Sequence, residues 1–391
     1  MAGAARARLQ NYAASPRFAA RVRRNGTIPN EAVALYFAAA PENMYQFEMW
    51  RRPLEQLAES RPVFVIVDRP DTGQLVLASS TLPVAYARGT PALETLVTKH
   101  KIRVVLYVNQ VEANFRMLRF PEPVHIQIGH GESDKVFSVS NQHKAYDLTF
   151  VGGEAGRDRL AHALRDFDAD RRTVQIGRPQ LDHEYPGAPD WPRDSGLRVW
   201  YAPTWEADRP SGAYGSLASH GVAMIRALLA DPSIRVLYRP HPRTGQISPA
   251  YAAADRRVRA LLVAGGDRHL VDESDYGWQW QFADACITDI SSVAYDWLAT
   301  GKPLVITEPV AAAAHRPPSA LLDTLPLLSA EDAGQVWVVL HRLGLDQTRP
   351  ARDPQLIELA GYYFGDTANG ASSRRFAAAI EHAYALPAPG V

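Results

Sequence analysis

The chain has 391 residues, with 42 basic and 42 acidic side chains and therefore a formal net charge of zero. This balance argues against a protein whose whole surface grips nucleic acid. At roughly 100–200 residues per domain, the length predicts two domains. The single cysteine, Cys286, excludes an internal disulfide framework and a cysteine-rich metal site.

The first 30 residues form a basic N-terminal arm that holds no acidic residue. It lacks the continuous apolar core of a secretory signal, and no run of about 18 apolar residues elsewhere predicts a membrane-spanning helix. One interpretation is a solvated terminus; another is attraction to an anionic membrane or a polyanionic substrate. A transit peptide is a weaker alternative. The arginines of the arm are Arg6, Arg8, Arg17, Arg21, Arg23 and Arg24.

The remainder of the chain alternates between helical periodicity and short apolar runs. Apolar strands separated by helices predict parallel pairing, with both faces of each sheet covered. In the first half we expect helices over 44–60 and about 90–100, and strands over 63–67, 103–109, 124–128 and 147–151. In the second half we expect strands over 197–203, 234–240, 285–289 and 303–307, and helices at about 213–230, 251–263, 291–300 and 371–385.

These elements predict an α/β protein with two Rossmann-like domains facing a cleft. The segment 178–196 holds four prolines and is typical of an inter-domain connector. The predicted divisions are the arm (1–30), an N-terminal domain (31–180), a linker (181–196) and a C-terminal domain (197–391). The final helix is expected to pack back across the cleft.

Ligands of open parallel sheets bind beyond the carboxyl ends of the strands, so the residues that follow each strand are the candidate site residues. After 124–128 comes His130, flanked by Gly129 and Gly131. Histidine is suited to take a proton near neutral pH, and the glycines let a ligand approach the backbone closely. Lys135 follows and could reach a phosphate as a point charge. The alternatives are a structural loop histidine and a solvated lysine.

Arg239 lies at the end of the strand 234–240, and His241 follows that strand two residues later. Pro240 and Pro242 stiffen this segment in an extended conformation, which places both cationic side chains on one face. Such a pair suits a phosphate or diphosphate.

The strand 285–289 ends at Asp289, and Ser291 and Ser292 follow at the start of a helix. Asp289 or Ser291 could cap that helix, and free N–H groups beside two hydroxyls suit an anion. Thr204, after the strand 197–203, could add a contact. Lys302 is expected to complement a helix C-terminus.

Three other features predict structure rather than chemistry. The run 152–156 differs from the GxGxxG spacing and indicates a tight turn between a strand and a helix. The acidic run 166–170 lacks the glycine of a calcium loop and indicates a solvated helix end. Cys286 lies within a core strand.

The histidines show no HExxH pattern, so no metal site and no cofactor is predicted.

The motifs that follow these strands resemble those of the CDP-glycerol glycerophosphotransferases. These are the teichoic-acid polymerases and primases of Gram-positive cell walls, with relatives in capsule synthesis. The family has a His-Gly-Thr-Pro-Leu-Lys motif after a strand; here the matching slot is 130–135, with Glu132, Ser133 and Asp134 in its middle. The segments that carry the resemblance are Tyr201-Ala202-Pro203-Thr204-Trp205, Arg239-Pro240-His241-Pro242, Thr288 to Asp296, Thr300-Gly301-Lys302-Pro303-Leu304 and Phe364 to Ser372.

The resemblance implies a GT-B fold with the donor nucleotide in the C-terminal domain and the acceptor on the side of the N-terminal domain. It implies transfer of a polyol phosphate, glycerol phosphate above all, from a CDP-linked donor to a hydroxyl of a lipid-linked or polymeric acceptor, with release of CMP. His130 would activate the acceptor hydroxyl, and His241 and Arg239 would bind the diphosphate and assist the departure of CMP. The other phosphate ligands would be Ser291, Ser292, Thr204 and Lys135, supported by Asp289 and Gly131.

The resemblance also implies a cytoplasmic enzyme, with the basic arm as a contact to the inner face of the plasma membrane and no nucleic-acid partner. Two alternatives stay open. One is a GT-B glycosyltransferase that uses a sugar nucleotide, and the other is a non-catalytic module that binds nucleotides or polyanions.

Overall fold

The computed structural model describes residues 2–24, 26–135, 139–185, 196–274, 276–314, 316, 318–345 and 352–387. The chain divides into two compact units. Unit 1 consists of Met1–Gly131, Ser140–His183 and Ala368–Val391, and unit 2 of Glu132–Val139 and Glu184–Thr367. The division differs from a linear one in two places, because 132–139 belongs to unit 2 and the C-terminal segment returns to unit 1. The predicted linker lies largely outside the described residues.

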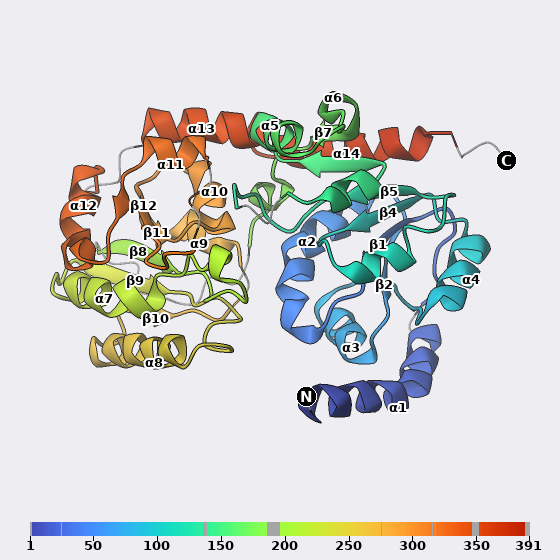
Figure 1. Cartoon of the computed structure of the whole chain (residues 1–391), viewed down its shortest axis with the longest axis horizontal. Coiled ribbons are helices and arrows are strands. Elements are labelled where there is room, and N and C mark those ends of the chain that lie inside the picture. The colour runs from blue at the N-terminus through green and yellow to red at the C-terminus, as the bar shows by residue number, and fades with distance from the viewer. Residues whose placement is uncertain are drawn as a thin grey trace. The chain divides into compact units, whose positions relative to one another are not determined.

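Unit 1 is built on a seven-stranded sheet in the order β3-β2-β1-β4-β5-β6-β7, with every neighbouring pair parallel. This order contains the 3-2-1-4-5-6 arrangement of a Rossmann sheet, with its switch point between β1 and β4. The strands are β1 (Val33–Phe37), β2 (Val63–Val67), β3 (Val84–Tyr86), β4 (Val104–Tyr107), β5 (Val124–Gln127), β6 (Leu148–Val151) and β7 (Thr173–Gln175) (Figure 1).

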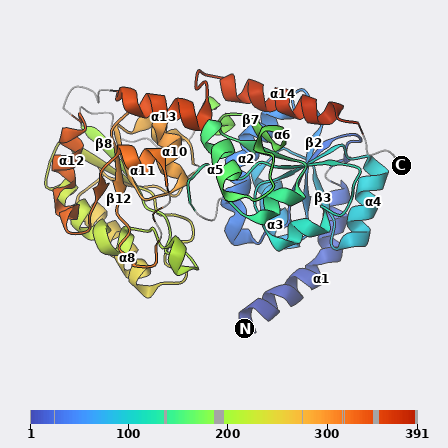
Figure 2. The same ribbon diagram turned by 45° about the horizontal axis from the view of Figure 1, so that its top comes forward.

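Helices cover both faces of this sheet because its central strands are apolar on both sides. One face packs against α2 (Met44–Leu57), α3 (Pro70–Ser79) and α14 (Ala371–Ala385), which contribute Phe47, Trp50, Val76 and Phe376 to one core. The other face packs against α4 (Thr90–His100) through Leu93 and Val97. Figure 2 shows α14 running along unit 1.

The basic arm is a helix, α1 (Ala2–Arg24), and not a frayed terminus. Its side chains Phe18 and Val22 are buried in the core of unit 1, and α1 lies beside α3 (Figures 1 and 2). Gly73 of α3 makes room for Phe18, since a Cβ at this position would clash with the phenyl ring. The Tyr86 hydroxyl also donates to Ser15 Oγ at 2.8 Å. Phe18 and Val22, two apolar residues of an otherwise basic segment, therefore fix α1 to unit 1.

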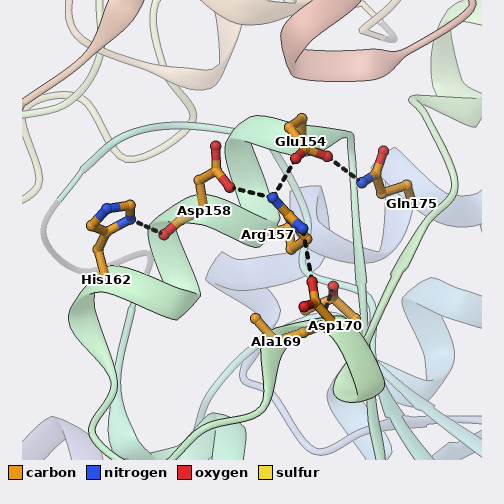
Figure 3. Close-up of polar contacts among 8 residues, drawn as sticks. Glu154, Arg157, Asp158, His162, Ala169, Asp170 and Gln175 are labelled. Atoms are coloured by element: carbon orange, nitrogen blue, oxygen red, sulfur yellow. Dashed lines mark hydrogen bonds and ion pairs between the residues drawn. The ribbon is translucent and has the colours of Figure 1, made fainter.

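The run after β6 forms the tight turn into α5 (Glu154–Ala163) that the sequence predicts. Arg157 of this helix forms ion pairs with Glu154, Asp158 and Asp170, and Glu154 also accepts from Gln175 (Figure 3). The acidic run 166–170 thus leads into the start of α6 (Ala169–Arg172), where Asp170 pairs with Arg157.

Unit 2 is built on a six-stranded parallel sheet in the order β10-β9-β8-β11-β12-β13, again a Rossmann arrangement, with its switch point between β8 and β11. The strands are β8 (Leu197–Ala202), β9 (Ile234–Tyr238), β10 (Leu270–Val271), β11 (Ala285–Thr288), β12 (Leu304–Thr307) and β13 (Leu327–Leu328).

One face of this sheet packs against α7 (Val222–Leu229), α8 (Pro249–Ala264) and α12 (Val336–Arg342). On the other face, Trp200 meets Trp297 of α10 (Ser292–Leu298) at 6.0 Å between ring centroids. The remaining helices are α9 (Trp278–Phe282), α11 (Ala320–Thr324) and α13 (Pro354–Phe364), and α7 is preceded by a π-helical turn, Leu217–Gly221.

Most predicted elements of the two halves match the observed ones within a few residues. The expected helix at 213–230 begins later, because its first part is loop and π-helical turn. The sequence prediction missed β1, the central strand of unit 1, and the short strands β3, β7, β10 and β13. Across the described residues, no helix combines the length and apolar character needed to span a membrane.

Candidate functional site

Asp289 ties together the strand ends of unit 2 at the switch point. Its carboxylate is fully buried and accepts hydrogen bonds from the backbone N–H of Thr204 at 2.7 Å, from that of Ser216 at 3.2 Å and from Thr307 Oγ1 at 2.6 Å. Burial raises the pKa of the Asp289 carboxyl, and these hydrogen bonds oppose the rise. Asp289 is therefore a brace between β8, β11 and β12 and does not cap α10.

Lys135 brings a positive charge to the same part of unit 2. Burial lowers the pKa of its ammonium group to about 8, and the negative charge of Asp289 opposes that shift. The Nζ atom lies 5.5 Å from the ring centroid of Tyr214. Within the described part of the chain, Lys135 takes part in no ion pair, so its charge is available to an anion.

The serines of the candidate phosphate site begin α10. Ser291 is the N-cap residue and is buried, but its side chain makes no capping hydrogen bond. Its hydroxyl lies 3.1 Å from Thr288 Oγ1, which itself donates to the Ala202 carbonyl, so Ser291 is the donor in that contact. Ser292 is half-buried in the first turn. The Ser291 hydroxyl can therefore still accept a hydrogen bond but has no proton left to donate. Ser292 has no corresponding hydrogen bond to Thr288.

Arg239 is already paired with an acid. Its Nη1 atom lies 2.8 Å from Asp272 Oδ2 and donates to the Ser274 carbonyl at 2.6 Å. Asp272 is buried and also accepts from Gln279 and from the backbone and hydroxyl of Ser274. Asp272 therefore offsets most of the charge that Arg239 could offer to a phosphate.

His241 is held in a defined orientation by its neighbours. The backbone N–H of Arg243 donates to His241 Nδ1 at 3.1 Å, which puts the proton of the neutral ring on Nε2. The ring stacks on Trp205 with 6.2 Å between centroids, and the Arg243 guanidinium lies 3.6 Å from the centroid of the same indole. Trp205 therefore packs against the His241 ring.

Glu206 organises the loop that follows His241. Its buried carboxylate accepts from the backbone N–H groups of Gly245, Ile247 and Ser248 at 2.9–3.0 Å. Burial alone would raise the pKa of Glu206, but the donated hydrogen bonds together lower it. The sequence prediction missed Glu206, Asp272 and Ser216. The available signal for Glu206 was an acid directly after the Thr204-Trp205 pair at a strand end.

His130 lies in unit 1, at the carboxyl end of β5. Its Nδ1 donates to the carbonyl of Val108 at 3.0 Å, so Nε2 of the neutral ring carries the lone pair. The ring meets Tyr45 edge to face, with 5.7 Å between centroids. Gly129 has φ = +61°, which favours glycine, and its carbonyl accepts from Trp50 Nε1. Gly131 ends this segment of unit 1.

Lys302 and Cys286, for which the sequence predicts structural roles, are both held inside unit 2. Lys302 Nζ donates to the carbonyls of Ala283 at 2.6 Å and Trp280 at 3.3 Å, so it caps the end of α9 and not the helix that precedes it directly. Cys286 is fully buried in β11, where burial raises the pKa of its thiol.

Comparison with known proteins identifies the family. Residues 107–310, just over half of the chain, match the family model described as CDP-Glycerol:Poly(glycerophosphate) glycerophosphotransferase. No curated protein matches the chain significantly.

Solved structures share the fold at low sequence identity. The wall teichoic acid polymerase TagF, in a structure obtained with CDPG, has a TM-score of 0.54 at 13% identity and covers 98% of each chain. A putative UDP-N-acetylglucosamine 2-epimerase from Listeria monocytogenes has a TM-score of 0.58 at 12% identity, over 92% of this chain and 98% of that one. A glycosyltransferase from Rickettsia africae has a TM-score of 0.55 at 10% identity, over 92% and 100%.

These likenesses confirm the α/β, GT-B-like fold class. The match to the family model, which spans every strand-end motif from β4 to β12, decides between the families that share this fold. The chain is a transferase that belongs to the CDP-glycerol:poly(glycerophosphate) glycerophosphotransferase family.

Proposed function

We propose that this protein transfers glycerol phosphate, or a closely related polyol phosphate, from a CDP-linked donor to a hydroxyl group of a cell-wall polymer acceptor and releases CMP. In this proposal unit 2 binds the donor and unit 1 supplies the group that activates the acceptor. The family match and the residues at the strand ends of each unit support these assignments.

The observation that carries the proposal is the opposite proton arrangement of the two histidines. His130 donates from Nδ1 to a backbone carbonyl, which leaves Nε2 able to accept a proton. His241 accepts at Nδ1 from a backbone N–H, which leaves a proton on Nε2 to donate. A general base and a hydrogen-bond donor to the leaving group need these two states.

The proposed reaction is an in-line transfer of the glycerol phosphate group between two oxygens. Nε2 of His130 takes the proton of the acceptor hydroxyl, and the acceptor oxygen forms a bond to the phosphorus of the glycerol phosphate group. The bond between that phosphorus and the bridging oxygen breaks, and its electron pair leaves with CMP. His241 Nε2–H donates to the oxygen of the departing CMP. Such transfers depend on alignment and on neutralisation of charge.

Phosphate binding in this proposal rests first on Lys135, because it takes part in no ion pair with a described residue. The first turn of α10 supplies N–H groups and the Ser292 hydroxyl, and Thr204 contributes its own hydroxyl. Ser291 contributes only its backbone N–H, because its hydroxyl proton is donated to Thr288. Arg239 has a smaller role than the sequence suggests, since Asp272 already balances its charge.

A nucleotide-release assay tests the proposal. The full-length enzyme is incubated with CDP-glycerol, CDP-ribitol or common UDP-sugars and a hydroxyl acceptor, and the free nucleotide is measured. We expect CMP only. Release of UDP would support a sugar-nucleotide glycosyltransferase instead, and binding of nucleotide without any release would support a non-catalytic module.

We also propose that α1 contacts an anionic lipid surface at the inner face of the plasma membrane, where a lipid-linked acceptor would be found. Arg17, Arg21 and Arg24 recur at helical spacing and are exposed, while Phe18 and Val22 hold the helix to unit 1. An open pocket of about 450 Å³ beside these arginines is lined by Ala13, Ala14, Arg17, Phe18, Arg21 and Gln74. Apolar walls with guanidinium groups suit an anionic lipid.

Co-sedimentation with vesicles tests this contact. We expect binding to vesicles that contain phosphatidylglycerol, loss of binding at high salt, and loss of binding when Arg17, Arg21 and Arg24 are replaced by glutamine. The matched control replaces three exposed arginines of unit 2, Arg226, Arg256 and Arg257. Equal loss in both variants would show that net charge alone, and not α1, carries the binding.

A further inference from the structure

The segment that carries Lys135 belongs to unit 2, although the chain on both sides of it belongs to unit 1. Residues 132–139 lie in unit 2, between segments that end at Gly131 and resume at Ser140. No described strand or helix includes residues 132–135, so no ladder of backbone hydrogen bonds holds them. Contacts of individual residues, and not a ladder, hold this segment in place.

Asp134 forms hydrogen bonds to two tyrosines of unit 2. Its side chain is only 9% exposed, and Oδ2 accepts from the hydroxyl of Tyr363 at 2.5 Å and from that of Tyr295 at 3.2 Å. The backbone N–H of Asp134 donates to the same Tyr295 oxygen at 3.2 Å. A buried carboxylate needs such donors, because burial without them is costly.

The two tyrosines are rigid parts of unit 2. Tyr295 lies in α10 and Tyr363 in α13, both are fully buried, and their rings meet edge to face at 4.9 Å between centroids. Burial, followed by the negative charge of Asp134, raises the pKa of both hydroxyls, so they remain protonated donors at neutral pH. Ser319 Oγ lies 3.5 Å and 3.4 Å from the two hydroxyl oxygens.

We propose that Asp134 is a positioning residue that anchors the 132–135 segment to Tyr295 and Tyr363 and thereby holds the Lys135 ammonium group beside Asp289 and Tyr214. The inference rests on the proposed function, in which Lys135 binds the donor phosphate. Lysine has a long side chain with many rotamers, and fixing its backbone removes part of the freedom that a phosphate would otherwise have to restrict.

This role also accounts for one departure from the family motif. The family has an uncharged residue at the position of Asp134, whereas this chain pairs an acid with two tyrosine hydroxyls from α10 and α13. The charge of Asp134 is thus stabilised by hydrogen bonds inside unit 2.

The scarcity of lysine makes a direct test practicable. The chain has five lysines, so reductive methylation with ¹³C-formaldehyde gives a small set of NMR signals, and Lys135→Arg assigns the signal of interest. In the wild type we expect the Lys135 signal to titrate with a pKa near 8. In Asp134→Ala the freed segment should expose the ammonium group and move that pKa toward its ordinary value.

Three further variants separate positioning from general destabilisation. Asp134→Asn keeps an oxygen that accepts from the tyrosine hydroxyls and should titrate nearly like the wild type. Tyr363→Phe removes one donor and should give an intermediate shift, and it serves as the test if Asp134→Ala does not fold. Asp255→Ala removes another tyrosine–carboxylate hydrogen bond of unit 2, from Tyr238 at 2.7 Å, and should leave Lys135 unchanged.

Kinetics with CDP-glycerol complete the test. We expect KM to rise about tenfold in Asp134→Ala, the scale of one misplaced charge-assisted contact, with recovery in Asp134→Asn. A Lys135 titration and a KM that both match the wild type would overturn the anchor while the function stands. A shifted titration in a protein whose wild type releases no CMP would overturn the function and leave the anchor standing.

Discussion

Asp289 accepts a 2.7 Å hydrogen bond from the backbone N–H of Thr204, so the end of β11 is tied to the end of β8. The same carboxylate holds Ser216 and Thr307, and its charge acts on Lys135. One buried acid therefore shapes the loops on both sides of the switch point in unit 2. Its importance is structural in the first place, and the candidate phosphate ligands depend on it.

Replacing Asp289 by asparagine should destabilise the protein strongly. The amide keeps one oxygen for the backbone N–H groups of Thr204 and Ser216, and the Thr307 hydroxyl has to turn to accept from its NH₂ group. The charge that strengthens these hydrogen bonds is lost, and a hydrogen bond to a charged group contributes about 1.5–3 kcal/mol. We expect a loss of about 2–4 kcal/mol in the free energy of unfolding, measured with urea. Asp208→Asn, at an exposed position of unit 2, should change stability by less than about 0.5 kcal/mol. Equal stability of the two variants would contradict the bracing role.

His130→Ala should fold and lose most of its transferase activity. A general base of this kind contributes about 10²–10⁴ in rate, so CMP release should fall by that factor while the thermal midpoint changes little. His162→Ala is the control, since His162 also bonds a backbone carbonyl through Nδ1, that of Asp158 at 2.7 Å, but is exposed on α5. Turnover of His130→Ala near the wild-type rate would rule out the base.

Lys302 and Lys135 should respond in opposite ways to the same substitution. Lys302→Met removes two hydrogen bonds to the end of α9 and should cost about 1–3 kcal/mol of stability while kcat/KM stays within about twofold. Lys135→Met should cost little stability, because burial already disfavours its charge, and should raise KM for the donor. Denaturation curves and CMP release measured on both variants decide between these expectations.

His269 should make stability depend on pH below neutrality. Burial, together with Arg268 and Arg235, lowers the pKa of His269 from 6.5 to about 4, and its Nδ1 accepts from the Val236 N–H. The unfolded chain therefore binds more protons than the folded one between these values. The stability contributed by the neutral ring is complete above pH 6.5 and is lost as the pH falls toward 4, by on the order of 2–3 kcal/mol.

The variant that isolates this effect is His269→Asn, which keeps an acceptor for the Val236 N–H and removes the titration. Its unfolding free energy should fall less steeply between pH 6.5 and 4 than that of the wild type. Parallel slopes would show that other buried histidines, such as His125 and His220, carry the pH dependence.

Local patterns were enough to predict much of the fold. The apolar runs of β2, β4, β8 and β11 stand between turn residues, and the helices that separate them have clear periodicity, so parallel sheets followed. The strand β1 was missed although it lies at the centre of unit 1, because residues 1–30 were interpreted as an arm and no helix was predicted before Val33–Phe37. The docking of α1 was missed because only Phe18 and Val22 signal it.

The sequence by itself determined the fold class, the family resemblance and the residues that follow each strand, since these depend on periodicity and on short motifs. Only the tertiary structure decided what those residues are bonded to. Thr204 and Asp289 lie 85 positions apart, and Arg239 and Asp272 lie 33 apart. The ion pair with Asp272 offsets the charge of Arg239, and backbone contacts set the proton arrangement of His130 and His241. These properties follow from distances in space, which motif spacing does not contain.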